Sequence, residues 1–208
     1  MYPNSISKAK CREHTMSEII LFERQTLSLA LIEKELYQLY NSLSEKVEEV
    51  AARTLFAYIA TDSLKHSTIL VKIIEEVNGS KAREQDCDQN IIHTQKLINA
   101  ITKNVEKSEK VDRKELMRLI NTLADFENLL HGEYKKAFHI EYEVFTENEQ
   151  ENQKEEDLNI FNLIVDDEER HQKILSSITR LCDRNLTFNN NAPIVKYTSP
   201  DSWYSPPR

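Results

Sequence analysis

Helical spacing of apolar residues along almost the whole chain is the feature that most constrains the fold. Apolar side chains recur every three or four residues, the period that places them on one face of an α-helix. Only two glycines and five prolines occur among the 208 residues, which leaves few positions for the tight turns of a β-sheet protein. The sequence therefore predicts an all-α fold and disfavours all-β and doubly wound folds.

The helical pattern divides into long segments separated by turn signals. Ser44, followed by acidic residues, is typical of a helix start, and Asn78 with Gly79 is typical of a helix end. Residues 79–110 form a long connection that contains a shorter helical piece over residues 90–102. Two helices, a long crossover and two more helices favour an antiparallel ferritin-like four-helix bundle over other bundles. The four long helices are predicted over residues 17–43, 45–77, 111–145 and 155–184.

The chain divides into one domain and two terminal segments. Residues 17–184 are predicted to form the bundle, and residues 1–16 a flexible N-terminal segment. The tail, residues 185–208, is rich in asparagine, proline and aromatic residues and is interpreted as extended or disordered. Residues 147–157 are acidic and are interpreted as a solvated loop or helix end.

Composition narrows the class of function. A formal net charge of −8 argues against nucleic-acid binding, which needs a basic surface. No apolar run approaches the roughly 18 residues that span a membrane, and the first residues lack the apolar core of a secretory signal. Three scattered cysteines without a Cys-x-x-Cys pair argue against a disulfide framework or a zinc ribbon. We therefore expect a cytoplasmic protein without a membrane or nucleic-acid partner.

Each long helix carries an apolar stripe that polar residues interrupt near its middle. A buried carboxylate costs several kcal/mol unless a partner neutralises it. Three such carboxylates together with two histidines therefore predict a bound cation. Glu168 and His171 are three residues apart, so both project from one face of one helical turn. The interrupting residues are Glu33, Ser63, His66, Glu127, Glu168 and His171.

A simpler interpretation stays open beside the metal site. His66 alone would be a hydrogen-bonded core residue, and Glu-x-x-His occurs by chance on many charged helices. Glu33 and Glu127 would be exposed to solvent if a different side of their helices faced the core. Polar residues interrupt all four apolar stripes at a similar level along the bundle, which favours a metal site over a metal-free descendant of the same fold.

Four stretches carry a resemblance to a known family. The chain resembles the ferritin-like superfamily, especially its rubrerythrin and bacterioferritin branch, over residues 17–184. In two respects it departs from that pattern: the bridging glutamate of the second helix falls on Ser63, and no rubredoxin-type cysteine pairs are present. The stretches are "EKELYQLY" (33–40), "IATDSLKHS" (59–67), "DFENLLHGEY" (125–134) and "DDEERHQKIL" (166–175).

The resemblance implies a role for each interrupting residue. Glu33 and Glu127 would be terminal carboxylate ligands, His66 and His171 terminal imidazole ligands, and Glu168 a bridging carboxylate. On this assignment the half-site of Glu127, Glu168 and His171 has an intact composition. The other half-site must share Glu168.

Four further residues are candidates near the metal. Asp62, four residues before His66, is a candidate ligand with a shorter side chain. Asp62 and Asp167 are also candidates for hydrogen bonding to a ligating histidine. Tyr40 and Tyr134 each follow a candidate glutamate by seven residues. The resemblance implies that these tyrosines tune or protect the metal during catalysis.

The implied cofactor is iron, as one or two ions, with manganese or zinc as alternatives. The implied activity is that of a ferroxidase- or peroxidase-type oxidoreductase, which oxidises Fe(II) or reduces O2 or peroxide. Because Ser63 replaces a bridging glutamate, a mononuclear or asymmetric site is also predicted. We expect a homo-oligomer, a dimer or larger. The competing hypothesis is a metal-free bundle that acts as an interaction or scaffold protein through residues 185–208.

Overall fold

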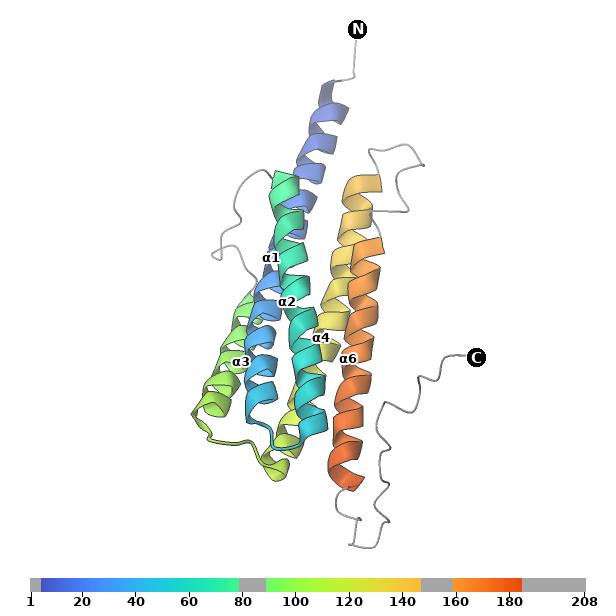
Figure 1. The fold of residues 1–208 in the computed structure, drawn as a ribbon. Helices are drawn as coiled ribbons and strands as arrows, with labels where there is room; N and C mark the ends of the chain where they lie inside the picture. The colour runs from blue at the N-terminus through green and yellow to red at the C-terminus, as the bar shows by residue number, and fades with distance from the viewer. Residues whose placement is uncertain (1–4, 79–88, 147–158, 185–208) are drawn as a thin grey trace, which may run out of the picture.

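The computed structural model of the chain describes residues 5–78, 89–146 and 159–184. These residues are almost entirely helical and contain no β-strand, which confirms the predicted all-α fold. The helices are α1 (Ser5–Lys46), α2 (Val50–Asn78), α3 (Gln89–Lys107), α4 (Arg113–Thr146) and α6 (Asn159–Arg184), as drawn in Figure 1.

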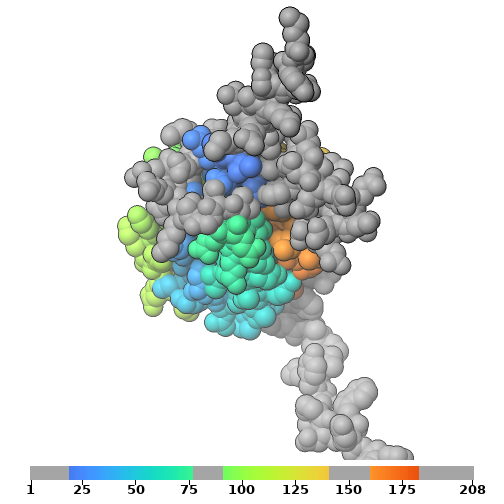
Figure 2. All heavy atoms as spheres, turned by 90° about the horizontal axis from the view of Figure 1, so that it is seen from above, coloured from blue at the N-terminus to red at the C-terminus, as the bar shows by residue number. Residues whose placement is uncertain are grey.

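Four of the helices form an antiparallel bundle, and the fifth lies outside it. Helix α1 packs against α2 and α4, and α6 packs against the same two helices from the other side. Each helix of this ring therefore runs opposite to both of its neighbours (Figure 1). Helix α3 packs mainly on α1 and lies on the flank of the molecule away from α6, as the view along the bundle in Figure 2 shows.

The crossover carries the chain back along the length of the bundle. Helix α2 ends at one end of the bundle, whereas α4 begins at the other (Figure 1). Helix α3 covers the part of this distance that leads to α4 (Figure 1), and its residues Ile91, Ile98 and Val105, spaced seven residues apart, are buried. The helix predicted over residues 90–102 is therefore present but longer, from Gln89 to Lys107.

The turn between α1 and α2 differs from the prediction. The expected helix start at Ser44 is wrong, because α1 continues to Lys46 and the Ser44 hydroxyl donates a hydrogen bond of 2.7 Å to the carbonyl of Asn41 within that helix. Helix α2 begins at Val50, where a Glu49 carboxylate oxygen accepts a hydrogen bond of 3.2 Å from the Ala51 amide. The side-chain acceptor at the start of α2 is therefore Glu49, five residues after Ser44.

The N-terminal boundary also differs from the prediction. Helix α1 begins at Ser5, so most of the segment expected to be flexible over residues 1–16 is helical. Helix α6 is described from Asn159, so the start predicted near residue 155 lies outside the described residues. The acidic loop over 147–157 and the tail over 185–208 lie outside the described residues. None of the described helices is long and apolar enough to cross a membrane.

The predicted stripes form the core. Their apolar members are buried, from Phe22 on α1 to Cys182 on α6. On α2, Ile73 is only partly buried, whereas Ile74, four residues after Leu70, is buried in the core. The polar residues that interrupt the stripes are buried with them, so the middle of the bundle encloses a polar layer.

Candidate metal centre

The polar layer contains the five candidate ligands, and every bundle helix contributes to it. Each of the five side chains belongs to a residue that is at most 1% exposed. Because all of them replace apolar residues on core-facing stripes, helical geometry alone directs them inward. They are Glu33 on α1, His66 on α2, Glu127 on α4, and Glu168 and His171 on α6.

The five residues form two groups that share one carboxylate. The first group, here called the α1–α2 half-site, consists of Glu33, His66 and the shared Glu168. The second, the α4–α6 half-site, consists of Glu127, His171 and the shared Glu168. In each group the donor atoms all lie within 4.8 Å of one another.

Distances around the two imidazoles show how closely the donors converge. In the α1–α2 half-site, His66 Nδ1 lies 3.2 Å from Glu33 Oε1 and 3.3 Å from Glu168 Oε1. In the α4–α6 half-site, His171 Nδ1 lies 3.0 Å from Glu127 Oε2 and 3.8 Å from Glu168 Oε1. Both imidazoles therefore direct Nδ1 to the carboxylates in the centre of the bundle.

The shared carboxylate is not satisfied by the protein. Neither oxygen of Glu168 has a hydrogen-bond partner among the described residues, and the same holds for Glu33 Oε2. A buried polar atom left without a partner costs about 1–3 kcal/mol, and a charged one more. The centre of the bundle thus contains three carboxylate oxygens that form no hydrogen bond among the described residues.

These donors fit a divalent metal of the first transition row. Oxygen and nitrogen ligands lie about 2.0–2.2 Å from an ion such as Zn(II), so two ligands of one ion are at most about 4.4 Å apart. The four separations around the imidazoles, 3.0 to 3.8 Å, meet this limit. Carboxylate and imidazole donors together suit Fe(II), Mn(II) and Zn(II).

The two tyrosines predicted near the metal bind the terminal glutamates across the bundle. Tyr40 on α1 donates a short hydrogen bond to Glu127 on α4. Tyr134 on α4 donates a hydrogen bond of 2.7 Å to Glu33 on α1. Each tyrosine therefore holds the glutamate of the opposite helix, not the one that precedes it by seven residues.

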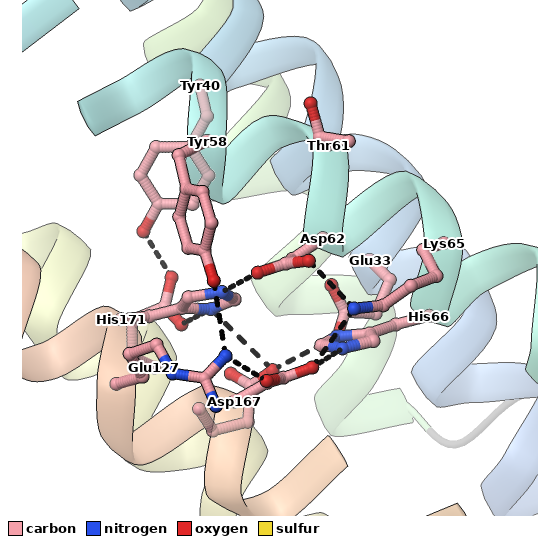
Figure 3. Close-up of polar contacts among 12 residues, drawn as sticks. Glu33, Tyr40, Tyr58, Thr61, Asp62, Lys65, His66, Glu127, Asp167 and His171 are labelled. Atoms are coloured by element: carbon pink, nitrogen blue, oxygen red, sulfur yellow. Dashed lines mark hydrogen bonds and ion pairs between the residues drawn. The ribbon is translucent and has the colours of Figure 1, made fainter. Parts of the chain in front are cut away.

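Two aspartates bind the outer nitrogens of the imidazoles, also across the bundle (Figure 3). Asp167 Oδ2 on α6 lies 3.1 Å from His66 Nε2 on α2. Asp62 Oδ2 on α2 lies 3.4 Å from His171 Nε2 on α6. Asp62 belongs to neither ligand group, and its contact is the one expected of a residue that orients a ligating histidine.

Two half-exposed cations contact the aspartates. Lys65 Nζ lies 2.7 Å from Asp62 Oδ1 and 3.1 Å from Asp167 Oδ2. Arg170 forms a short ion pair with Asp167 and a hydrogen bond of 3.1 Å to the Tyr58 hydroxyl. The lysine thus contacts both aspartates, whereas the arginine contacts one.

Burial and neighbouring charges change the ionisation of the groups at the centre. Burial raises the pKa of Glu168 well above its ordinary value, and the negative charges of Glu33 and Glu127 raise it further. Burial opposes the charge of His171, but hydrogen bonds to Asp62 and Glu127 outweigh it and raise the pKa of His171 to about 9. Without a metal, the centre therefore holds protons that a bound cation would displace.

Other pKa shifts keep the surrounding groups in the form that their contacts require. Burial raises the pKa of Tyr40 and of Tyr134 well above 10, so both phenols stay protonated and donate. Burial would raise the pKa of Asp62, but hydrogen bonds from His171 and Lys65 lower it. Asp62 therefore remains a charged acceptor.

Lys65 and Arg170 were not predicted to lie near the site, although a repeated pattern in the sequence indicates both of them. Asp62 to His66 reads Asp-Ser-Leu-Lys-His, and Asp167 to His171 reads Asp-Glu-Glu-Arg-His. In both, aspartate precedes histidine by four residues, a cation precedes it by one, and the second position is serine in one copy and glutamate in the other. The outer network is thus a property of two equivalent segments.

Comparison with known protein families matches residues 26–179 to the family described as rubrerythrin. No curated protein and no solved structure matches the chain. The match covers well over half of the chain and includes both Asp-x-x-x-His segments and both glutamate–tyrosine helices. The chain therefore belongs to the rubrerythrin family, within the ferritin-like superfamily.

Proposed function

We propose that this protein binds iron at the two half-sites and uses it to oxidise Fe(II) with O2 or peroxide, or to reduce peroxide. Glu33, Glu127, His66 and His171 would hold the metal at its outer positions, and Glu168 would lie between the two half-sites. Iron in such a site supplies reversible one-electron chemistry. The rubrerythrin family match and the donor set support the choice of iron.

The observation that carries the proposal is the environment of Glu168. This carboxylate is fully buried and lies between two imidazoles, and neither of its oxygens forms a hydrogen bond among the described residues. A protein without a metal would gain stability by replacing it with an apolar residue of similar size. Its presence at the meeting point of four helices is accounted for by a ligand that it binds.

The chain's own groups prepare the site for this chemistry. The surrounding core keeps bulk water away from all five ligands, which strengthens electrostatic interactions there. Tyr40 and Tyr134 fix the terminal carboxylates by donating hydrogen bonds, and their raised pKa values keep them protonated. Asp62 and Asp167 fix the imidazoles from the outside, so that Nδ1 points inward.

Metal binding is tested by loading untagged apoprotein with Fe(II) under anaerobic conditions and measuring the metal content after desalting. We expect one or two equivalents in the unmodified protein and less than about a tenth of that in Glu168→Gln. The matched control is Glu169→Gln, which neutralises the next residue on α6, an exposed carboxylate 3.9 Å from Lys173. This control should retain the metal content of the unmodified protein.

The reaction is tested separately by exposing the loaded protein to O2 or to peroxide and following iron oxidation by absorbance. Faster oxidation by peroxide than by O2 would assign a peroxidase-type activity, and the reverse a ferroxidase-type activity. No iron, manganese or zinc retained by the unmodified protein would contradict the proposal. That result would favour the metal-free scaffold hypothesis instead.

A further inference from the structure

The outer network of the metal centre contains one residue that contacts both of its halves. Lys65 is the cation of the α2 segment, and its ammonium group lies within 3.1 Å of both Asp62 and Asp167. Those aspartates bind the outer nitrogens of His171 and His66. One flexible side chain on the surface is therefore connected, through two hydrogen-bonded pairs, to both imidazoles of the candidate site.

We propose that Lys65 is a positioning residue for both half-sites: by bridging Asp62 and Asp167, it orients the imidazoles of His171 and His66. This inference rests on the proposed metal function. It concerns how the ligands are arranged, not which atoms bind the metal. It also explains why two carboxylates from different helices lie together at the surface of the bundle.

The two aspartates share one positively charged neighbour. Both carry negative charge and both contact one ammonium group, so they are held close together by it. Without that cation, repulsion between the carboxylates would favour their separation. Each aspartate that moves away releases an imidazole Nε2, and a buried imidazole without its outer partner can rotate. Groups that orient a ligating histidine typically affect metal affinity by about 10–100-fold.

The equivalent cation of the other segment provides an internal comparison. Arg170 pairs with Asp167 and with the Tyr58 hydroxyl, and no ion pair or hydrogen bond joins it to Asp62. Apart from the imidazoles, Asp167 therefore contacts two cations, whereas Asp62 contacts Lys65 alone among the described residues. Removing Lys65 should affect both imidazoles, but His171 more than His66. Removing Arg170 should affect His66 only.

The direction of the effect separates positioning from simple charge. Lys65 is a positive group close to a site for cations, so its charge alone weakens metal binding. If repulsion between charges were its main effect, replacing it with a neutral residue would tighten binding. If Lys65 acts by positioning, the same replacement weakens binding. Whether the metal affinity rises or falls when Lys65 is replaced therefore distinguishes the two effects.

The first experiment titrates the full-length apoprotein with Co(II), whose visible spectrum reports its coordination. Lys65→Met keeps the length of the side chain and removes its charge, and Lys65→Arg keeps the charge. The control is Lys72→Met, an exposed lysine two turns further along α2 that has no ion pair or hydrogen bond among the described residues. We expect about tenfold weaker binding in Lys65→Met, recovery in Lys65→Arg and no change in Lys72→Met.

The effect on each half-site is then measured separately, by introducing the same substitutions into two proteins that each lack one of the histidines. In His66→Ala, only the α4–α6 half-site remains, and Lys65→Met should weaken it about tenfold while Arg170→Met leaves it unchanged. In His171→Ala, only the α1–α2 half-site remains, and both substitutions should weaken it, each by a smaller factor. Equal affinity of Lys65→Met and Lys72→Met, or tighter binding in Lys65→Met, would overturn the inference.

A measurement without metal keeps this inference separate from the proposed function. In apoprotein labelled with 15N-histidine, the Nε2 protons of His66 and His171 should exchange with water faster in Lys65→Met than in the unmodified protein. Unchanged exchange would overturn the inference whatever metal the protein binds. If exchange increases but no metal binds to the unmodified protein, the positioning contact stands and the proposed function fails.

Discussion

The two half-sites have the same number of donors but a different origin. The α4–α6 half-site takes all three ligands from its own pair of helices, whereas the α1–α2 half-site takes Glu33 and His66 from its own pair and Glu168 from α6. The difference follows from one position in the repeated segment, which is Ser63 on α2 and Glu168 on α6. One carboxylate therefore serves two imidazoles.

The distances show that Glu168 is not reserved for its own helix pair. Its Oε1 lies 3.3 Å from His66 Nδ1 and 3.8 Å from His171 Nδ1, so it is nearer to the imidazole of the half-site that lacks its own second carboxylate. The outer contacts cross the bundle in the same manner, with each aspartate and each tyrosine binding a residue of the opposite half. Each half-site is therefore held in place by residues of the other half.

The largest expected effect comes from removing one imidazole at a time. His171→Ala and His66→Ala should each abolish one half-site and leave at most one metal equivalent per chain, because the other half-site keeps its three donors. Metal content after anaerobic Fe(II) loading, followed by desalting, measures this. If either single variant lost all bound metal, the description as two half-sites would be wrong and a single shared site would replace it.

The next effect is a dependence of apoprotein stability on pH that belongs to the α4–α6 half-site. The pKa of His171 is raised from 6.5 to about 9, so its protonated form stabilises the folded state. This stabilisation is complete below pH 6.5 and is lost as the pH rises through 9; at about 1.4 kcal/mol per pKa unit it amounts to about 3 kcal/mol. The raised pKa of Glu168 acts in the same direction.

We therefore expect the melting temperature of the apoprotein to fall by several degrees between pH 6.5 and 9. Differential scanning calorimetry measures the melting temperature at each pH. In the comparison variant His171→Gln, the melting temperature should fall less steeply with pH. The metal-loaded protein should show the opposite trend, because ligands must lose their protons to bind. A slope unchanged in His171→Gln would assign the pH dependence to other groups.

A smaller effect is expected from making the two segments alike. Ser63→Glu places a second carboxylate at the position equivalent to Glu168 and should raise affinity for the second metal about tenfold, or about 1.4 kcal/mol. Ser63→Gln is the matched control, because it adds the same volume without charge. In the apoprotein, the added buried charge should lower stability relative to this control. Equal metal affinity of the two variants would show that Ser63 does not limit the site.

The smallest effect should come from the tyrosine hydroxyls. Tyr40→Phe removes the donor to Glu127, and Tyr134→Phe removes the donor to Glu33, so each should change the metal affinity of one half-site by a factor of a few, about 1 kcal/mol. Tyr37→Phe, on the same helix but only partly buried, serves as the control. Co(II) titration measures all three. A change in both half-sites from one substitution would show that the tyrosines act on the shared Glu168.

Much of the fold and of the ligand set could be predicted because both follow from helical spacing. The apolar stripes identified the core faces, and the polar residues that interrupt them had to point into the bundle. Helix ends were less predictable: Ser44 resembles a cap, yet nothing after it prevents α1 from continuing to Lys46. Local capping preferences are worth only about 1 kcal/mol, so packing of the flanking residues decides where a helix stops.

By itself, the sequence determined which side chains face the centre of the bundle, because a period of 3.6 residues assigns each position to a face. It also determined that Ser63 occupies, in one of the two repeated segments, the position that Glu168 occupies in the other. Only the tertiary structure decided which residues meet. It paired Asp62 with His171, Asp167 with His66, and Lys65 with both aspartates. Those contacts depend on the rotation and separation of neighbouring helices, which no spacing along a single helix specifies.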